Sequence, residues 1–117
     1  MIDLSAFHAL ADTPVGEFTR KATSFEGEQE EASVALFTSP DGRVEIGVWE
    51  CSEGRFNADR SDSSEFCHFI SGKIEMTHAD GRKVQLGAGD AIALPLGWKG
   101  EWRVIERVRK LYVIMQG

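Results

Sequence analysis

Hairpin signals constrain this 117-residue chain more than any other feature of its sequence. Asp80-Gly81 lies between two strand-like runs, 73–79 and 82–86, and is the strongest of these signals because an Asp-Gly pair readily adopts a two-residue turn. Further clusters of turn-forming residues lie at 39–42 and 87–90. No segment shows the alternation of strands and helices that a parallel sheet requires. We therefore predict an all-β fold of about nine or ten short strands.

The clearest of the expected strands can be placed by their residue ranges. They cover residues 34–38, 43–51, 73–79, 82–86, 91–94, 101–105 and 110–115. One short helix is expected as well, in an N-terminal arm that covers residues 1–14. Apolar residues from Leu4 to Ala11 recur at helical spacing, Asp3 can cap the first turn, and Thr13-Pro14 would end the helix.

Length and composition indicate a single domain over residues 1–117. The chain is 42% hydrophobic and long enough to bury a core, and its net charge of -6 disfavours nucleic acid and anionic membranes as partners. No apolar run reaches the length of a membrane span, and the first residues lack the pattern of a secretory signal, so a cytoplasmic location is expected. Cys51 and Cys67 each lie in an apolar strand pattern. Free buried thiols are expected, with a disulfide between them as the alternative.

Three segments of the chain carry a resemblance to a known superfamily. They cover residues 65–75, 87–98 and 102–114, with a Glu65-to-Gly72 spacing and a Gly-Asp to Pro-x-Gly spacing. Together they resemble the cupin superfamily, and within it the (S)-ureidoglycine aminohydrolase-like or ethanolamine-utilisation-Q-like subgroup. The resemblance spans about residues 43–115. It implies a cupin-type double-stranded β-helix, an RmlC-like jelly-roll barrel.

The resemblance also implies a homodimer, because small barrels leave strand edges that need cover. The N-terminal segment and the strand at 34–37 are the expected contributors.

The same resemblance raises the question of a metal. In metal-binding cupins two histidines, one residue apart, precede the glutamate of the first motif, and a third follows the glycine of Pro-x-Gly by three residues. Here residues 58–61 contain no histidine, and the third position is Gly100. Only Glu65 remains, whereas a catalytic metal needs about three protein ligands. We therefore expect no metal and no cofactor. An unconventional site built from Glu65, Asp59 and Cys67 is the alternative.

Strand alternation predicts which side chains face the interior. Glu65 shares a face with Cys67, and Trp102 shares one with position 100, where a metal ligand is missing. A buried Glu65 needs a partner, for which Arg60 and Lys110 are candidates, or else its pKa must rise. We predict one interior pocket for a small polar metabolite, lined by Glu65, Cys67, Trp49, Trp102, Lys110 and Tyr112.

Three functions stay open at this stage. The first is a small-molecule-binding cupin of unassigned reaction, without the usual histidines. The second, which the resemblance implies, is a small enzyme that acts on an amino or ureido metabolite. Its general acid or base would be Glu65, with Cys67 as a less favoured nucleophile. The third is a structural accessory protein whose pocket is vestigial.

Overall fold

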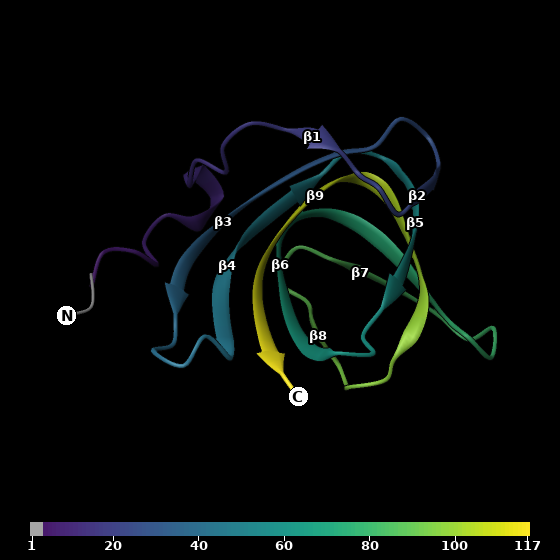
Figure 1. Ribbon diagram of the computed structural model, residues 1–117. Coiled ribbons are helices and arrows are strands. Elements are labelled where there is room, and N and C mark those ends of the chain that lie inside the picture. The colour runs from purple at the N-terminus through teal and green to yellow at the C-terminus, as the bar shows by residue number, and fades with distance from the viewer. Residues whose placement is uncertain (1–3) are drawn as a thin grey trace.

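The protein is one strongly curled antiparallel sheet in a computed structural model (Figure 1), of which residues 4–117 are described. Every strand pair in it is antiparallel, so the all-β prediction is confirmed. The strands are β1 Thr19–Arg20, β2 Ser24–Glu26, β3 Glu30–Thr38, β4 Val44–Cys51, β5 Gly54–Asp59, β6 Ser63–His78, β7 Lys83–Gly87, β8 Ala91–Leu94 and β9 Lys99–Gln116.

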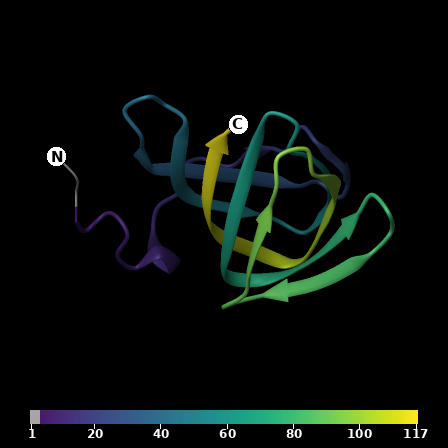
Figure 2. The same ribbon diagram turned by 90° about the horizontal axis from the view of Figure 1, so that it is seen from below.

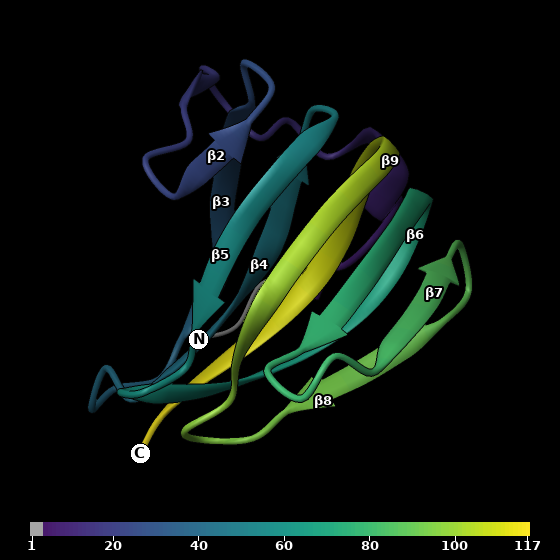
Figure 3. The same cartoon turned by 90° about the vertical axis from the view of Figure 1, so that its right-hand side faces the viewer.

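Two long strands, β6 and β9, organise the barrel. They pair with each other from Ser63–Gln116 to His78–Gly100. The other edge of β9 is shared between β5 and β4, and the other edge of β6 between β8 and β7. The sheet therefore wraps around an interior, seen end-on in Figure 1 and from the side in Figure 3. Figure 2 shows β7 and β8 on the opposite side of the barrel from the N-terminal segment.

The bend in β6 depends on Gly72. Its φ is +91°, and a Cβ atom at this position would collide with the backbone carbonyl oxygen of Arg107 on β9. The pairing register with β9 shifts repeatedly between Phe69 and Ile74, so the strand can turn while it stays paired.

Three strand predictions were wrong in the same way. Segments 101–105 and 110–115 are not separate strands but parts of the continuous β9, and 73–79, apart from its last residue, is only the second half of β6. The charged residues between 105 and 110 obscured the apolar alternation. Between residues 105 and 110 only the apolar Val108 is buried, while the charged Glu106 and Arg107 face outward. By contrast, the strand predicted at 91–94 coincides with β8.

The predicted N-terminal helix is also wrong. Within residues 4–117 the only helical element is the single 3₁₀ turn η1, Leu10–Asp12. The segment instead lies against the outer face of β3 and β4, where Val15 packs with Ala32 and Val48. The Arg109 guanidinium donates hydrogen bonds to the carbonyls of Leu10 and Thr13, which ties this segment to β9. The proposed cap Asp3 lies outside the described residues.

Aromatic rings fill the centre of the barrel. Trp102 is 1% exposed, and its ring lies 5.5 Å from that of Phe56, 5.9 Å from that of Trp49 and 5.9 Å from that of Phe69. The interior is therefore packed at this level, and the cavity described below lies against these rings. No helix in residues 4–117 is long and apolar enough to cross a membrane.

Candidate functional site

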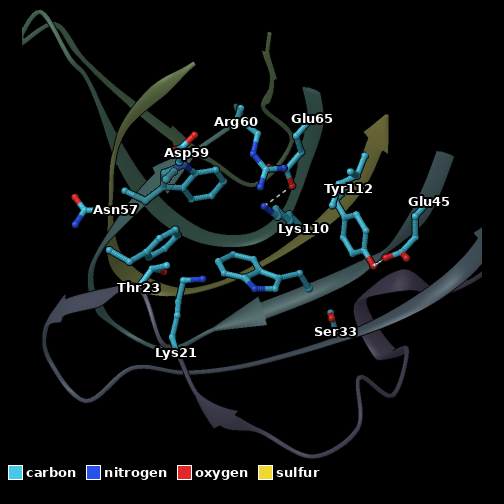
Figure 4. A pocket seen from close by; sticks show the side chains of 15 residues that line it. Lys21, Thr23, Ser33, Glu45, Asn57, Asp59, Arg60, Glu65, Lys110 and Tyr112 are labelled. Carbon is cyan, nitrogen blue, oxygen red and sulfur yellow. Dashed lines mark hydrogen bonds and ion pairs between the residues drawn. The ribbon is translucent and has the colours of Figure 1, made fainter. Parts of the chain in front are cut away.

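A cavity of about 410 Å³ opens into the barrel interior (Figure 4). Strands β4, β5, β6 and β9 supply most of its walls, and the segment between β1 and β2 supplies Lys21 and Thr23. Five of the six predicted pocket residues line it: Glu65, Trp49, Trp102, Lys110 and Tyr112.

Glu65 and Lys110 form a buried ion pair in this cavity. Lys110 Nζ lies 2.8 Å from Glu65 Oε2, and both side chains are 8% exposed. Arg60 approaches the other carboxylate oxygen, with Nη1 3.7 Å from Oε1. Antiparallel pairing of β6 with β9 puts the two partners on one face, since Phe69 lies opposite Lys110 and Cys67 opposite Tyr112. The partner that a buried Glu65 needs is therefore Lys110.

Both members of this pair are charged at neutral pH. Burial tends to raise the pKa of Glu65, but the Lys110 ammonium and the Arg60 guanidinium outweigh it and hold the pKa below its usual value. Burial tends to lower the pKa of Lys110, and the Glu65 carboxylate outweighs it, so that pKa is raised. Glu65 is therefore a carboxylate that can accept a proton but not donate one.

The Lys110 ammonium also lies between two indole rings. Its Nζ is 4.4 Å from the centroid of Trp49 and 4.4 Å from that of Trp102. A second ammonium, that of Lys21, lies 4.2 Å from the ring centroid of Phe56 and pairs with Glu31 at 2.9 Å. Cations on ring faces are attracted by the ring quadrupole. The aromatic walls of the cavity are thus already in contact with the protein's own cations.

Tyr112 and Glu45 form a further polar pair in the cavity wall. The Tyr112 hydroxyl donates to Glu45 Oε2 at 2.6 Å, and burial together with this carboxylate raises the pKa of Tyr112, so the phenol stays neutral. Gly47 lies opposite Tyr112 on β4, and a Cβ there would come within 2.5 Å of the hydroxyl oxygen. The glycine therefore leaves room for the ring.

Cys67 does not lie among the residues that line the cavity, although it is fully buried beside them. Burial raises its pKa to about 12, and that of Cys51 to about 11. Both are free thiols, as predicted, with no disulfide between them. A protonated, enclosed thiol is a poor nucleophile, so Cys67 packs the core here.

The residues around Glu65 do not fit a divalent metal. Position 100 has no room for an imidazole, because even a Cβ there would collide with the Thr77 carbonyl oxygen and lie 2.6 Å from Trp98 Cη2. Ala58, the partner of Gly100 across β5 and β9, offers no ligand atom either. Within residues 4–117 no group of three or more His, Cys, Asp and Glu side chains is placed to hold a metal ion. The unconventional site of Glu65, Asp59 and Cys67 is therefore not assembled.

The three histidines lie elsewhere. His8 and His68 are exposed, and His78 accepts a hydrogen bond from Trp98 Nε1 at 3.1 Å near the end of β6. None of them lines the cavity that holds Glu65. The histidines therefore do not complete a site around that carboxylate.

Several cavity residues were missed by the sequence reasoning. Phe56, Asn57 and Ala58 belong to β5, which was not predicted as a strand, and Lys21 comes from an irregular segment. A sequence signal for β5 exists in its inward Phe56, but two charged residues and a glycine dilute its alternation.

The fold and this site can be compared with known proteins. The model of the EutQ-like cupin domain matches residues 38–112, more than half of the chain. The chain belongs to the EutQ-like cupin domain family. The cupin prediction and the ethanolamine-utilisation-Q-like part of the resemblance are thereby confirmed, and the ureidoglycine aminohydrolase-like part stays a prediction.

Solved structures support this assignment. The EutQ protein of Clostridium difficile is 26% identical, with a TM-score of 0.73 over 97% of this chain and 90% of that chain. A putative ethanolamine utilization protein Q from Salmonella typhimurium is 23% identical, with a TM-score of 0.68 over 85% of this chain and 78% of that chain. A DUF861 family protein from Thermotoga maritima is 35% identical, with a TM-score of 0.53 over 56% of this chain and 73% of that chain. No curated protein matches the chain.

Proposed function

We propose that this EutQ-like cupin domain binds a small polar metabolite inside its barrel, without a metal ion. The observation that carries the proposal is the cavity of about 410 Å³ around the buried Lys110–Glu65 pair. Ligand pockets are typically clefts of about 300–1,000 Å³ with mostly apolar walls and a few placed polar groups. Trp49, Phe56 and Trp102 supply such walls, and fixed charges lie against them.

The charged pair supports a binding role because it is rigidly placed. Lys110 is held by one carboxylate and two indole rings, so its position does not depend on a ligand. A vestigial cavity would gain nothing from a buried ion pair, since well-packed apolar residues are often at least as stable. The pair therefore favours a pocket in use over the structural accessory role.

A thermal-shift screen of small metabolites tests the proposal. A ligand that binds the folded protein raises its melting temperature in a concentration-dependent way. Ala58→Phe places a ring in the cavity without removing a polar group and should abolish the shift. Ala91→Phe, at an exposed position on β8, is the matched control and should keep it. A ligand whose shift survives Ala58→Phe binds elsewhere, and its binding would contradict the proposed site.

An enzyme that acts on an amino or ureido metabolite is the second candidate. The observation in its favour is an ionised Glu65 in a cavity, which can serve as a general base. Turnover of such compounds by the purified chain, lost in Glu65→Gln and kept in Ala91→Phe, would establish it. Turnover that persists in Glu65→Gln would remove the candidate base and this version of the enzyme with it.

A further inference from the structure

The three carboxylates that line the cavity already accept hydrogen bonds from protein donors. Glu65 accepts from Lys110, and Glu45 accepts from Tyr112. Asp59 accepts from the backbone amide and the hydroxyl of Ser61. A ligand that offers only donors, such as an amine, would have to share these carboxylates with the protein donors.

The faces of the aromatic rings in the cavity wall are likewise in contact with protein groups. Lys110 lies over Trp49 and Trp102, and Lys21 over Phe56. An aromatic cage that receives a ligand cation needs a free ring face. Here the protein's own ammonium groups take those places, so the cavity is poorly suited to a cationic ligand.

Donors around the cavity, by contrast, are left without partners. Arg60 Nη1 and Trp102 Nε1 are the two buried side-chain atoms in residues 4–117 that make no hydrogen bond, and both residues line this cavity. Buried donors are nearly always paired in folded proteins, so an unpaired one calls for an explanation, such as an absent partner. Two unpaired donors at one cavity indicate a ligand that brings hydrogen-bond acceptors.

Arg60 is positioned to receive such a partner. Its amide donates to the Trp98 carbonyl at 2.8 Å, and its own carbonyl accepts from the Gly97 amide at 2.7 Å, so its backbone is fixed at the cavity rim. Its side chain points into the cavity beside Glu65 and Lys110 (Figure 4). The 3.7 Å approach to Glu65 is too long for a hydrogen bond, and a quarter of the side chain is exposed. Its guanidinium is therefore partly exposed and is not held by a hydrogen bond from Glu65.

We infer that the cavity selects a small organic acid, a carboxylate on an apolar body, with Arg60 as the residue that binds the carboxylate. This rests on the proposed function and names its ligand class. A guanidinium matches a carboxylate with two parallel hydrogen bonds, and the indole and phenyl walls suit an apolar body. An amine finds no comparable unpaired partner, because the carboxylates of Glu45, Asp59 and Glu65 already accept hydrogen bonds from protein donors.

Two sets of compounds, each of nearly equal size, test the ligand class. The first is benzoate, benzamide and benzylamine, and the smaller set is butyrate, butyramide and butylamine. Binding is measured by calorimetry, with inorganic phosphate alongside. We expect the carboxylates to bind and the amides and amines not to. Arg60→Gln should weaken carboxylate binding about tenfold or more, since a charge-assisted hydrogen bond is lost. Arg82→Gln, which alters an exposed arginine of the β6–β7 hairpin, should leave it unchanged.

The outcomes separate this inference from the proposed function. Binding of an amide or amine that Ala58→Phe abolishes and Arg60→Gln does not would overturn the acid class and leave the binding pocket standing. Phosphate binding as tight as that of benzoate would also overturn it, since the site would then hold any anion. Failure of every compound in a broad screen would overturn both. If Arg60→Gln does not fold, Arg60→Lys keeps the charge without the planar fork and should still weaken the carboxylates selectively.

Discussion

The Lys110–Glu65 pair is the residue-scale feature with the largest energetic consequence. Both charges are buried, and each holds the other in its ionised form. Lys110→Met should lower the free energy of unfolding by about 3–5 kcal/mol, because it leaves a buried carboxylate unpaired. Urea denaturation measures this loss. The double variant Lys110→Met with Glu65→Leu should recover much of it, and a double variant less stable than either single one would contradict the pairing.

The same pair predicts an acid dependence of stability. The folded pKa of Glu65 is lowered, so its contribution is present above the unfolded value of about 4.3 and is lost as pH falls through the folded pKa. Lys110 has a raised pKa, so its contribution is lost only as pH rises through that value, on the alkaline side. In Lys110→Met the Glu65 pKa should rise, so the stability that Glu65 loses in acid should shrink, and it should become a gain once the folded pKa exceeds the unfolded value. Urea denaturation at a series of pH values checks this, with Arg82→Gln as the control. A free energy of unfolding that falls in acid as it does in the unaltered protein would contradict the expectation.

Trp102 offers a second test at this scale. Its ring contacts three other aromatic rings and is 1% exposed. Trp102→Ala should cost about 3–5 kcal/mol, as expected for a buried core ring. Trp102→Phe keeps an aromatic ring and removes the unpartnered Nε1 donor, so its cost should be much smaller. Equal losses for the two variants in denaturant melts would show that the ring itself contributes little.

At the scale of elements, strand parity explains what could be predicted of the site and what could not. Alternation along β6 and β9 placed Glu65, Lys110 and Tyr112 on inner faces without any coordinates, and the structure brings all three to one cavity. Parity cannot show which strands meet across a barrel. Arg60 was therefore only one of two candidate partners for Glu65, and Lys21 was not considered.

The wrong element predictions have a related cause. β9 stays paired through its charged middle because β6 supplies hydrogen bonds there, with Arg109 opposite Ser71 and Glu106 opposite Lys73. Local pattern cannot reveal that support. The helix predicted in the N-terminal segment was wrong for a similar reason. Arg109, which is remote in sequence, donates hydrogen bonds to two carbonyls of that segment.

Two elements together decide the prediction on metals. β5 and β9 bring Ala58 opposite Gly100, and neither position offers a ligand, while Lys110 lies against the one carboxylate that remains. We expect elemental analysis of the purified protein to find no stoichiometric zinc, iron, nickel or manganese. About one such ion per chain, lost in Glu65→Ala and kept in Arg82→Gln, would contradict the expectation.

At the scale of the whole molecule, β3 forms a sheet edge that is largely unpaired. β1 pairs with it only at Glu30 and Glu31, so within the described residues the edge from 32 to 38 has no neighbouring strand on that side. Phe37 is 36% exposed near its end. Exposed strand edges template pairing with another chain. This geometry supports the proposal that two copies pair along β3, with the N-terminal segment beside the contact.

Light scattering at micromolar concentration should therefore give twice the mass of one chain. Phe37→Lys should convert the dimer to a monomer without unfolding it, because an edge lysine opposes strand pairing and Phe37 is not part of the barrel interior. Phe66→Lys, at a similarly exposed phenylalanine on the outer face of β6, is the matched control and should leave the mass doubled. A wild-type chain that stays monomeric would refute the dimer. A dimer that survives Phe37→Lys and dissociates in Phe66→Lys would move the contact to the β6 face. Because the cavity residues come from within one barrel, small-molecule binding should persist in the monomeric variant.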